Sequence, residues 1–269
     1  MSEGYFPRGS SVLRRVHGAR IVGVLYGQRA LLLQATDPVA FEGLMADTTG
    51  LDAPFQRLVH TAKTMETVFF GSRAEADDAT ARVRAMHERV PAATEPEFLL
   101  WILACLADSA QAAYERFVRR LDDRERAALW KDYLTVGELF GLARSEAPAD
   151  YGAYRAYMGA RLESDALEVI PRAREIGRMV AFDLPLPTHR RPALTVVNLC
   201  VLGLLPARVR RMYGLRWSPA HEAAFQAVAA SSRAAAPVTP NKIRRGPSAA
   251  DYDLVARTER RRLRERSAA

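Results

Sequence analysis

The cysteines and histidines, whose side chains serve as metal ligands, nucleophiles and acid–base groups near neutral pH, are few in this sequence. They comprise two cysteines and five histidines: Cys105, Cys200, His17, His60, His87, His189 and His221. Several common sites are missing. There is no glycine-rich phosphate loop, no Cys-x-x-Cys pair for zinc and no Gly-x-Ser-x-Gly nucleophile elbow. None of the residues three positions before a histidine is acidic, which also argues against a carboxylate-bridged di-iron bundle.

One histidine, His87, lies in a context that favours chemistry. Residues 74–90 have helical periodicity, with apolar residues on one face that predict a largely buried helix. Arg84 precedes His87 by three residues and therefore lies beside it on the same flank. A histidine that reaches into an apolar helical cavity beside a cation is one way to bind haem. On the residues alone, the favoured interpretation is the simpler one, in which both side chains solvate the edge of a core helix. His189, in a loop, and His221, in a first helical turn, are expected to be structural.

The cysteines and apolar segments bear on the compartment. Cys105 and Cys200 both lie inside apolar runs, where a free cysteine behaves as a small hydrophobic residue, so a disulfide framework is not expected and a reducing cytosol fits. The first residues lack the apolar segment of a signal peptide. The longest apolar run, residues 194–205, is shorter than the roughly 20 residues that span a bilayer. We therefore expect a cytoplasmic protein without a membrane span.

Charge is unevenly distributed along the 269 residues. The formal net charge is +8, and residues 241–269 contribute nine cations against four carboxylates, or +5 of that total. The remaining 240 residues are nearly balanced, whereas a nucleic-acid-binding body should itself be basic. The 49% of hydrophobic residues supports a folded core and excludes a disordered chain. We expect a globular body without a nucleic-acid partner.

Helical signals run through the whole body. Thr94 and Glu97 form a possible capping box ahead of a long apolar stripe that ends near residue 121. Further helix starts are expected at Asp122, Pro171, Pro206 and Ser218-Pro219, and stops at Gly141 and Gly214. Residues 21–26 are the best candidate for a strand. The prediction is an all-α domain of eight to ten helices over residues 10–233, a linker over 234–247 and a basic C-terminal helix or tail over 248–269.

Several short motifs occur in an order and spacing that together resemble one family, the catalytic domain shared by bacterial rubber oxygenases (latex-clearing proteins) and MpaB-type oxygenases. The resemblance runs from about residue 14 to residue 217. It rests on RALLLQATDP at 29–38, RLVHTA at 57–62 continuing to 70–71, RVRAMH at 82–87, LLWILAC at 99–105 with Asp108-Ser109, LLPARVR at 204–210 and YGLRW at 213–217.

The resemblance implies a globin-like helical core around haem b, with a histidine as the proximal iron ligand. The matching histidine is His87, and Arg84 matches the arginine that precedes it. Arg57 and Thr61 match a second pair of residues in the haem pocket. His60 occupies the place of a lysine that approaches the iron in some rubber oxygenases. His60 is thus a candidate for the distal side, as a sixth ligand or as a donor to oxygen; the alternative is that it faces away from haem.

The sequence departs from the family pattern at three positions. Asp37-Pro38 stands where many members have His-Pro, and Leu103 and Cys105 replace the polar residues of a His-x-Thr or Arg-x-Thr motif. These changes predict either a drier pocket for a different apolar molecule or a member that binds haem without the family reaction. Cys105 is a second candidate for the iron ligand, but no cationic helix end is evident that would lower its pKa, so His87 is preferred.

The resulting expectation is a haem b-dependent oxygenase that uses dioxygen to oxidise, or oxidatively cleave, a carbon–carbon double bond of a hydrophobic small molecule. Arg57 and Arg84 would hold the haem propionates or polarise oxygen. Two alternatives stay open. One is a non-enzymatic haem-binding or sensor protein; the other is a helical partner- or nucleic-acid-binding module that acts through the Arg-rich tail. The sequence leaves the oligomeric state open.

Overall fold

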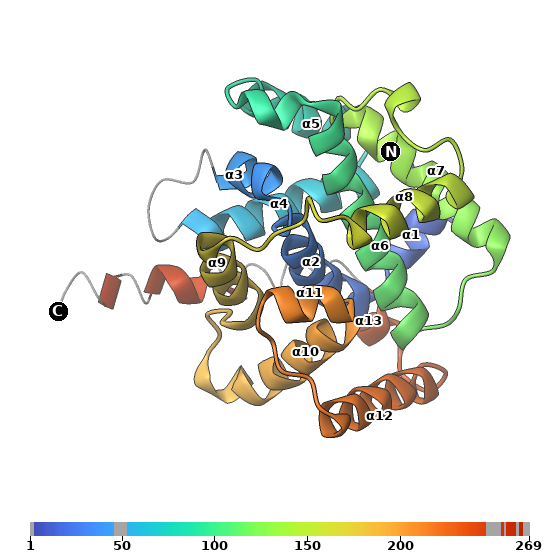
Figure 1. The fold of residues 1–269 in the computed structure, drawn as a ribbon. Coiled ribbons are helices and arrows are strands. Elements are labelled where there is room, and N and C mark those ends of the chain that lie inside the picture. Colours follow the sequence, from blue (N-terminus) through green and yellow to red (C-terminus); the bar gives the residue numbers. More distant parts are fainter. Residues whose placement is uncertain (1–2, 46–52, 246–253, 256, 262–263, 266–269) are drawn as a thin grey trace.

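The computed structural model describes residues 3–45, 53–245, 254–255, 257–261 and 264–265, and these form an all-helical fold (Figure 1). No strand occurs among the described residues, where a single isolated bridge joins Ala19 to Arg245. The α-helices are α1 (Val12–His17), α2 (Arg20–Gln34), α3 (Pro38–Met45), α4 (Ala53–Phe70), α5 (Arg73–His87), α6 (Pro96–Phe117), α7 (Asp123–Leu139), α8 (Tyr151–Glu163), α9 (Pro171–Phe182), α10 (Arg191–Leu204), α11 (Ala207–Met212), α12 (Pro219–Ala235) and α13 (Asn241–Arg244). Three 3₁₀ turns are η1 (Pro91–Thr94), η2 (Arg144–Glu146) and η3 (Thr188–Arg190).

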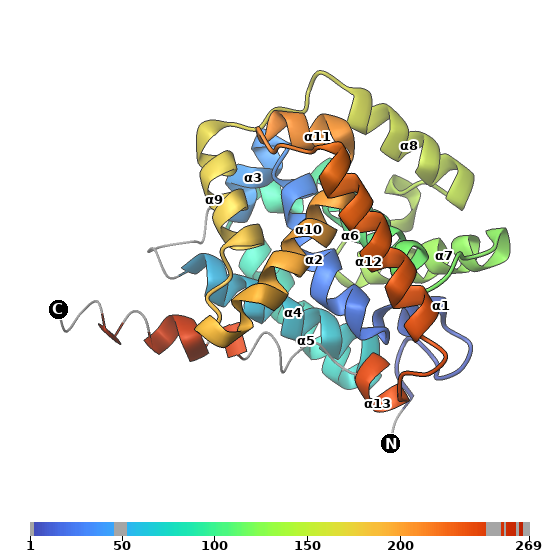
Figure 2. The same cartoon turned by 90° about the horizontal axis from the view of Figure 1, so that it is seen from below.

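Helices α2 and α6 pack against each other in the middle of the fold, and the other helices surround this pair (Figure 2). Both central helices are buried on more than one face, because α2 buries ten residues and α6 buries twelve. Small side chains of α6, among them Ala104 and Ala107, let the two backbones approach closely. The indole of Trp101 is fully buried and donates a hydrogen bond to the Gln34 carbonyl at 3.3 Å.

The predicted strand over residues 21–26 is wrong, because this segment forms the first turns of α2. Val22, Leu25 and Tyr26 are all buried, with the spacing of one helical face. A short apolar run does not distinguish a buried helix from a strand. Here the continuation of buried residues as far as Leu33 favours the helix.

Most of the helix-end signals are confirmed. Asp122 and Glu125 form a capping box at the start of α7, and Pro171 and Pro219 occupy the first turns of α9 and α12. Pro206 directly precedes α11. Gly141 and Gly214 adopt φ values of +98° and +65° just after α7 and α11, a conformation that favours glycine. The described part of residues 10–233 contains more α-helices than the eight to ten expected. The excess comes from short helices such as α1 and α11, which have six residues each.

The capping box predicted at Thr94 is wrong. Thr94 belongs to η1, and α6 begins two residues later at Pro96, with Glu95 as a cap that makes no side-chain hydrogen bond. Proline at the first helical position supplies the start instead, because it has no N–H to satisfy and its φ angle already suits a helix. The predicted apolar stripe of this helix is confirmed, but the helix begins at Pro96 rather than directly after Thr94.

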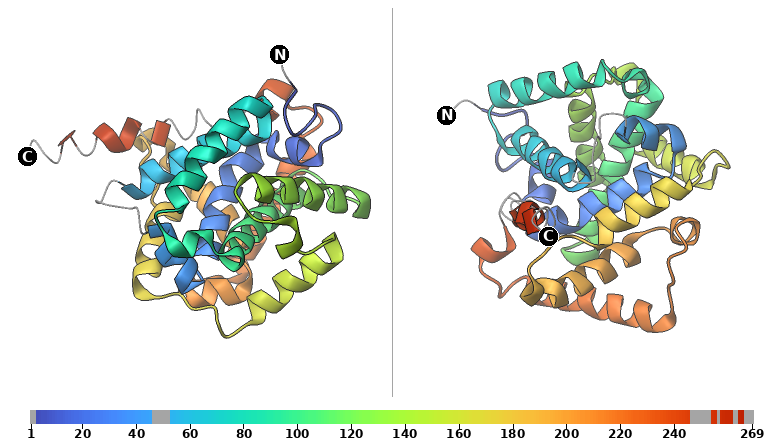
Figure 3. Two further views of the ribbon diagram at one scale, coloured as in Figure 1. Left: turned by 90° about the horizontal axis from the view of Figure 1, so that it is seen from above. Right: turned by 90° about the vertical axis from the view of Figure 1, so that its left-hand side faces the viewer.

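Helices α4 and α5 form an antiparallel pair at one side of the molecule (Figure 3). Ser72 caps α5 and forms a capping box with Glu75. The prediction that α5 is largely buried is wrong, because among its residues only Ala76, Ala79 and Thr80 are buried. This narrow buried stripe is enough to pack α5 on α4, while the outer face of α5 remains exposed to solvent. His87 therefore lies at the rim of the core rather than inside it.

Part of the basic C-terminal segment packs on the body. Val255 is buried in a second apolar cluster with Phe55 and Leu58 of α4 and Leu184 after α9. Helix α13 falls inside the segment expected to be a linker, and residues 246–253 lie outside the described part of the chain. Among the described helices, none is both long enough and apolar enough to cross a membrane.

Candidate active site

Arg84 and His87 line the same small hollow, at the point where three segments of the chain meet. The hollow has a volume of about 110 Å³. It lies between the end of α5, the η1–α6 connection and the end of α7. The other residues that line it are Glu88, Ala93, Thr94, Leu99, Phe140 and Gly141. The hollow therefore combines an imidazole, a guanidinium, a carboxylate and a hydroxyl group with aliphatic and aromatic side chains.

The end of α5 positions the imidazole. His87 is the last residue of the helix, and its carbonyl accepts a hydrogen bond from the Val90 amide at 2.8 Å, which turns the chain into η1. Arg84 lies one turn earlier on the same face. Both side chains are half-buried. The predicted adjacency of these two residues is thus present in the structure.

Arg84 joins α5 to the end of α7. Its Nη1 donates a hydrogen bond to the carbonyl of Leu139, the last residue of α7. The C-terminal end of a helix carries partial negative charge, which favours a cation there. The left-handed backbone of Gly141 reverses the chain just after this carbonyl, and a Cβ at Gly141 would lie 3.5 Å from Arg84 Cδ. The guanidinium is therefore held in place by two elements.

Three other predicted site residues lie on α4 and do not line this hollow. Arg57 is half-buried, whereas His60 and Thr61 are exposed. The opposite face of α4, with Phe55, Leu58, Val59 and Ala62, is buried against α9 and the C-terminal segment. Because α4 and α5 are antiparallel and connected by a short turn, Arg57 and His87 share the end of the pair remote from that turn. Arg84 and His87 line the hollow together, and these three residues are not among its lining residues.

The donor set at the hollow fits haem in its chemistry. One imidazole nitrogen suffices as an axial ligand, and a guanidinium suits a propionate. The space is smaller than the roughly 300–1,000 Å³ typical of cofactor sites. Admitting a porphyrin therefore requires the hollow to widen, and the half-buried Leu99 and Phe140 are the apolar side chains at its wall.

The departure at Asp37 has a structural role. Its Oδ1 accepts a hydrogen bond from the Ala40 amide at 3.0 Å, which satisfies a free N–H in the first turn of α3. Its Oδ2 forms an ion pair with Arg161 of α8. The guanidinium of Arg161 also lies 5.7 Å from the ring centroid of Trp101. The aspartate thus joins α3 to α8 and to the central helix α6.

The other two departures lie in the packed core. Leu103 packs so closely against α7 that a Cβ at Gly137 would lie 2.8 Å from its Cδ2. Cys105 is fully buried, and this burial raises the pKa of its thiol well above the ordinary value. The thiol therefore stays protonated at neutral pH, which argues against a thiolate ligand. Both cysteines are free and buried, as expected.

The remaining histidines have visible structural contacts. His17 is buried, with Nε2 2.7 Å from the Tyr133 hydroxyl and its ring stacked on Phe69. His221 caps α12, because its Nδ1 accepts a hydrogen bond from the Ser218 amide at 3.2 Å. His189 is exposed in η3, a short 3₁₀ turn rather than an irregular loop.

Sequence reasoning missed the other walls of the hollow. Leu99 and Phe140 carry no signal of their own, because both read as ordinary apolar helix positions. Gly141 did carry one, as a predicted helix stop, but nothing in the sequence indicated that the stop would lie against Arg84. The hollow exists only because the ends of α5 and α7 meet beside η1.

Comparison with known families identifies the class of protein. A profile described as "ER-bound oxygenase mpaB/B'/Rubber oxygenase, catalytic domain" matches residues 14–234. The match covers most of the chain and includes every residue of the hollow. The chain belongs to this family of oxygenase catalytic domains, in agreement with the resemblance seen in its motifs. Neither the curated proteins nor the solved structures include one that matches it.

Proposed function

We propose that this protein is a haem b-dependent oxygenase that uses dioxygen to oxidise a hydrophobic small molecule, by oxidation or oxidative cleavage of a carbon–carbon double bond. The observation that carries the proposal is the pairing of His87 with Arg84 at a partly apolar hollow inside a domain of an oxygenase family. The globin-like arrangement of the core around haem belongs to the same proposal.

His87 and Arg84 would hold the cofactor. The His87 imidazole offers a nitrogen lone pair to iron when its other nitrogen carries the proton. Arg84 stays charged at any physiological pH and can form two parallel hydrogen bonds with a propionate. A guanidinium has five N–H donors, so Arg84 can bind a propionate while it keeps its hydrogen bond to the Leu139 carbonyl. Haem b, when bound, supplies the iron chemistry by which dioxygen is activated.

Leu99 and Phe140 would present an apolar surface to the substrate. A hydrophobic molecule gains roughly 25 cal/mol for each Å² of apolar surface that it buries, without a need for polar partners. This is why we propose a hydrophobic substrate rather than a charged one. The loss of polar groups at Leu103 and Cys105, both buried on the neighbouring helix α6, is consistent with this choice.

The α4 residues have a separate place in the proposal. Arg57 and Thr61 lie one turn apart at the end of α4 that is level with His87, and we assign them to the wall of the cofactor pocket once it has widened. His60 lies between them in sequence and is exposed. It is the candidate for the distal side, where its imidazole would donate to, or compete with, oxygen.

The visible absorption spectrum tests the proposal. Purified protein, reconstituted with haem if necessary, should show a Soret band and a b-type pyridine haemochrome. His87→Ala should lose most of this band, because the axial ligand is gone. His189→Ala is the matched control, since His189 is exposed in a different part of the fold, and it should keep the full spectrum. A colourless protein that takes up no haem, or a His87→Ala variant with the wild-type spectrum, would overturn the proposal.

A second measurement distinguishes an oxygenase from a non-enzymatic haem protein. The reduced oxygenase should bind carbon monoxide and consume oxygen in the presence of an unsaturated hydrophobic compound. A six-coordinate, low-spin protein that does neither would have both axial positions filled. His60→Ala would then restore carbon monoxide binding if His60 were the second ligand.

A further inference from the structure

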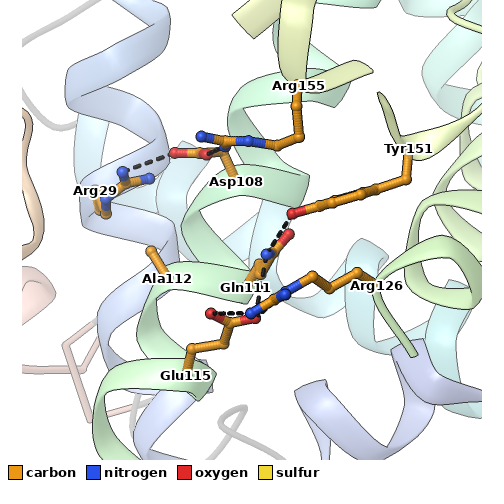
Figure 4. Close-up of a pocket in the computed structure, with 8 residues that line it drawn as sticks. All are labelled: Arg29, Asp108, Gln111, Ala112, Glu115, Arg126, Tyr151 and Arg155. Carbon is orange, nitrogen blue, oxygen red and sulfur yellow. Dashed lines mark hydrogen bonds and ion pairs between the residues drawn. The ribbon is translucent and has the colours of Figure 1, made fainter. Parts of the chain in front are cut away.

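A second, larger pocket shares no lining residue with the hollow at His87, and its volume is about 340 Å³ (Figure 4). Its floor is one face of α6, to which side chains of α2, α7 and α8 reach across. The residues that line it are Arg29, Asp108, Gln111, Ala112, Glu115, Arg126, Tyr151 and Arg155. All but Ala112 are polar or charged, in contrast to the hollow at His87.

A buried arginine anchors one end of this pocket. The side chain of Arg29 is 4% exposed, and it donates to the Leu204 carbonyl at 2.8 Å, to Ser109 Oγ at 2.8 Å and to Asp108 Oδ2 at 2.7 Å. The other carboxylate oxygen of Asp108 pairs with Arg155 at 2.8 Å. One carboxylate is therefore shared between two guanidinium groups, so positive charge is in excess at this end.

The polar side chains at the other end of the pocket also form hydrogen bonds with one another. Arg126 donates to both oxygens of Glu115, at 2.9 and 3.3 Å. Gln111 uses its two amide protons on Glu115, at 3.2 Å, and on the Tyr151 hydroxyl oxygen, at 2.7 Å. Neither Asp108 nor Glu115 is left as an uncompensated negative charge that would repel an anion.

Three polar groups in the lining of the pocket remain available for a ligand. Tyr151 accepts a hydrogen bond from Gln111, and its own O–H proton has no acceptor among the described residues. Arg155 uses a single N–H on Asp108, and half of its side chain is exposed. Gln111 Oε1 accepts no hydrogen bond from the described residues. The pocket therefore offers two donors and one acceptor to a ligand.

We propose that this pocket binds a small hydroxycarboxylate. The ligand's carboxylate would accept hydrogen bonds from the Arg155 guanidinium and the Tyr151 hydroxyl, and its hydroxyl group would donate to Gln111 Oε1. Three arginines against two carboxylates leave a net charge of +1 in the lining, which matches one carboxylate. The volume lies near the lower end of the range for small-molecule sites, which suits a ligand of few atoms.

Isothermal titration calorimetry of the full chain with sodium lactate tests this assignment. Binding should be saturable, in the millimolar range, and stronger than that of acetate, which lacks the hydroxyl group. Arg155→Gln should weaken lactate binding at least tenfold, because it removes a charge-assisted hydrogen bond. Asp108 keeps Arg29 as its partner in this variant, so the fold is retained. Tyr151→Phe should weaken binding as well.

Arg124→Gln is the matched control. Arg124 is exposed on α7, outside the pocket, and its replacement removes the same charge without touching the lining. It should leave the affinity for lactate unchanged. The proposal fails if wild-type protein shows no saturable binding of lactate, or if Arg155→Gln binds it as wild type does. It also fails if acetate or inorganic phosphate binds as tightly as lactate. None of these outcomes depends on haem binding at His87.

Discussion

Acidification should destabilise this protein through one buried histidine, His17. The imidazole is 6% exposed and stacks on Phe69 with ring centroids 4.1 Å apart, and its Nε2 lies 2.7 Å from the Tyr133 hydroxyl. Removal from water penalises the charged form and lowers the pKa of His17 from 6.5 to about 3. The folded protein therefore keeps this side chain neutral at a pH at which an unfolded chain would protonate it.

The sign and size of the effect follow from proton binding. Between pH 6.5 and about 3 the unfolded state binds the extra proton, so stability falls as the pH falls. Each pH unit below 6.5 costs about 1.4 kcal/mol. Lowering the pH from 6.5 to 5 should thus remove about 2 kcal/mol of unfolding free energy. Well above pH 6.5 the contribution is constant, because the histidine is then neutral in both the folded and the unfolded state.

Urea unfolding, followed by circular dichroism at pH 7.5 and pH 5, measures this difference. The double variant His17→Phe/Tyr133→Phe removes the titrating group together with its hydrogen-bond partner, so that no buried polar group is left unpaired. Other titrating groups are common to both proteins, and their effect cancels in the comparison. Wild type should lose about 2 kcal/mol more than the double variant between the two pH values. His189→Gln, at an exposed histidine, should behave as wild type.

An equal loss of unfolding free energy by wild type and the double variant on acidification would contradict this prediction. That result would mean that His17 is protonated in the folded state, or that water reaches it. A loss in wild type that begins only below pH 4 would also contradict it, since carboxylates would then account for the transition.

Two further predictions concern packing and thiol reactivity. Gly203→Ala should destabilise the protein by about 1–3 kcal/mol, because a Cβ at this position would overlap the Phe225 ring of α12. Gly159→Ala should instead stabilise α8 by about 0.5–1 kcal/mol, because a Cβ there has nothing within 4 Å and alanine favours a helix more than glycine does. Urea unfolding at pH 7.5 measures both, and a Gly203→Ala variant as stable as wild type would contradict the α10–α12 contact. Neither cysteine should react with a thiol reagent at pH 8 until urea is added. Cys105 and Cys200 are 0% and 2% exposed, and burial raises the pKa of both thiols, that of Cys200 to about 11. Rapid labelling of the folded protein would show that one of these thiols opens to solvent.

Local sequence determined much of the secondary structure. Asp122 and Ser218 begin helices because their side chains bond to amides three residues later in the same segment. Gly141 ends a helix because its backbone must turn to positive φ at that point. These effects act within one turn of the chain, so they can be inferred without knowledge of the rest of the fold. The family, too, could be inferred from short motifs in a fixed order.

The fold decided what no single segment contains. Residues 21–26 form a helix because other helices bury them, and α5 is mostly exposed because it packs on the body through one narrow stripe. Asp37 has a partner because α3 and α8 meet, although Arg161 lies 124 residues away. The pocket around Arg29, Asp108 and Arg155 joins α2, α6 and α8 in the same way.

In the candidate site, too, one feature follows from local sequence and the others depend on packing. The shared helix face of Arg84 and His87 could be predicted from their spacing, since three residues make nearly one helical turn. The surfaces that lie against that face depend on how the helices pack: they are the carbonyl end of α7, the turn at Gly141 and the apolar wall of Leu99 and Phe140. Packing brings together side chains and helix ends that are far apart along the chain, and their separation in sequence carries no local signal.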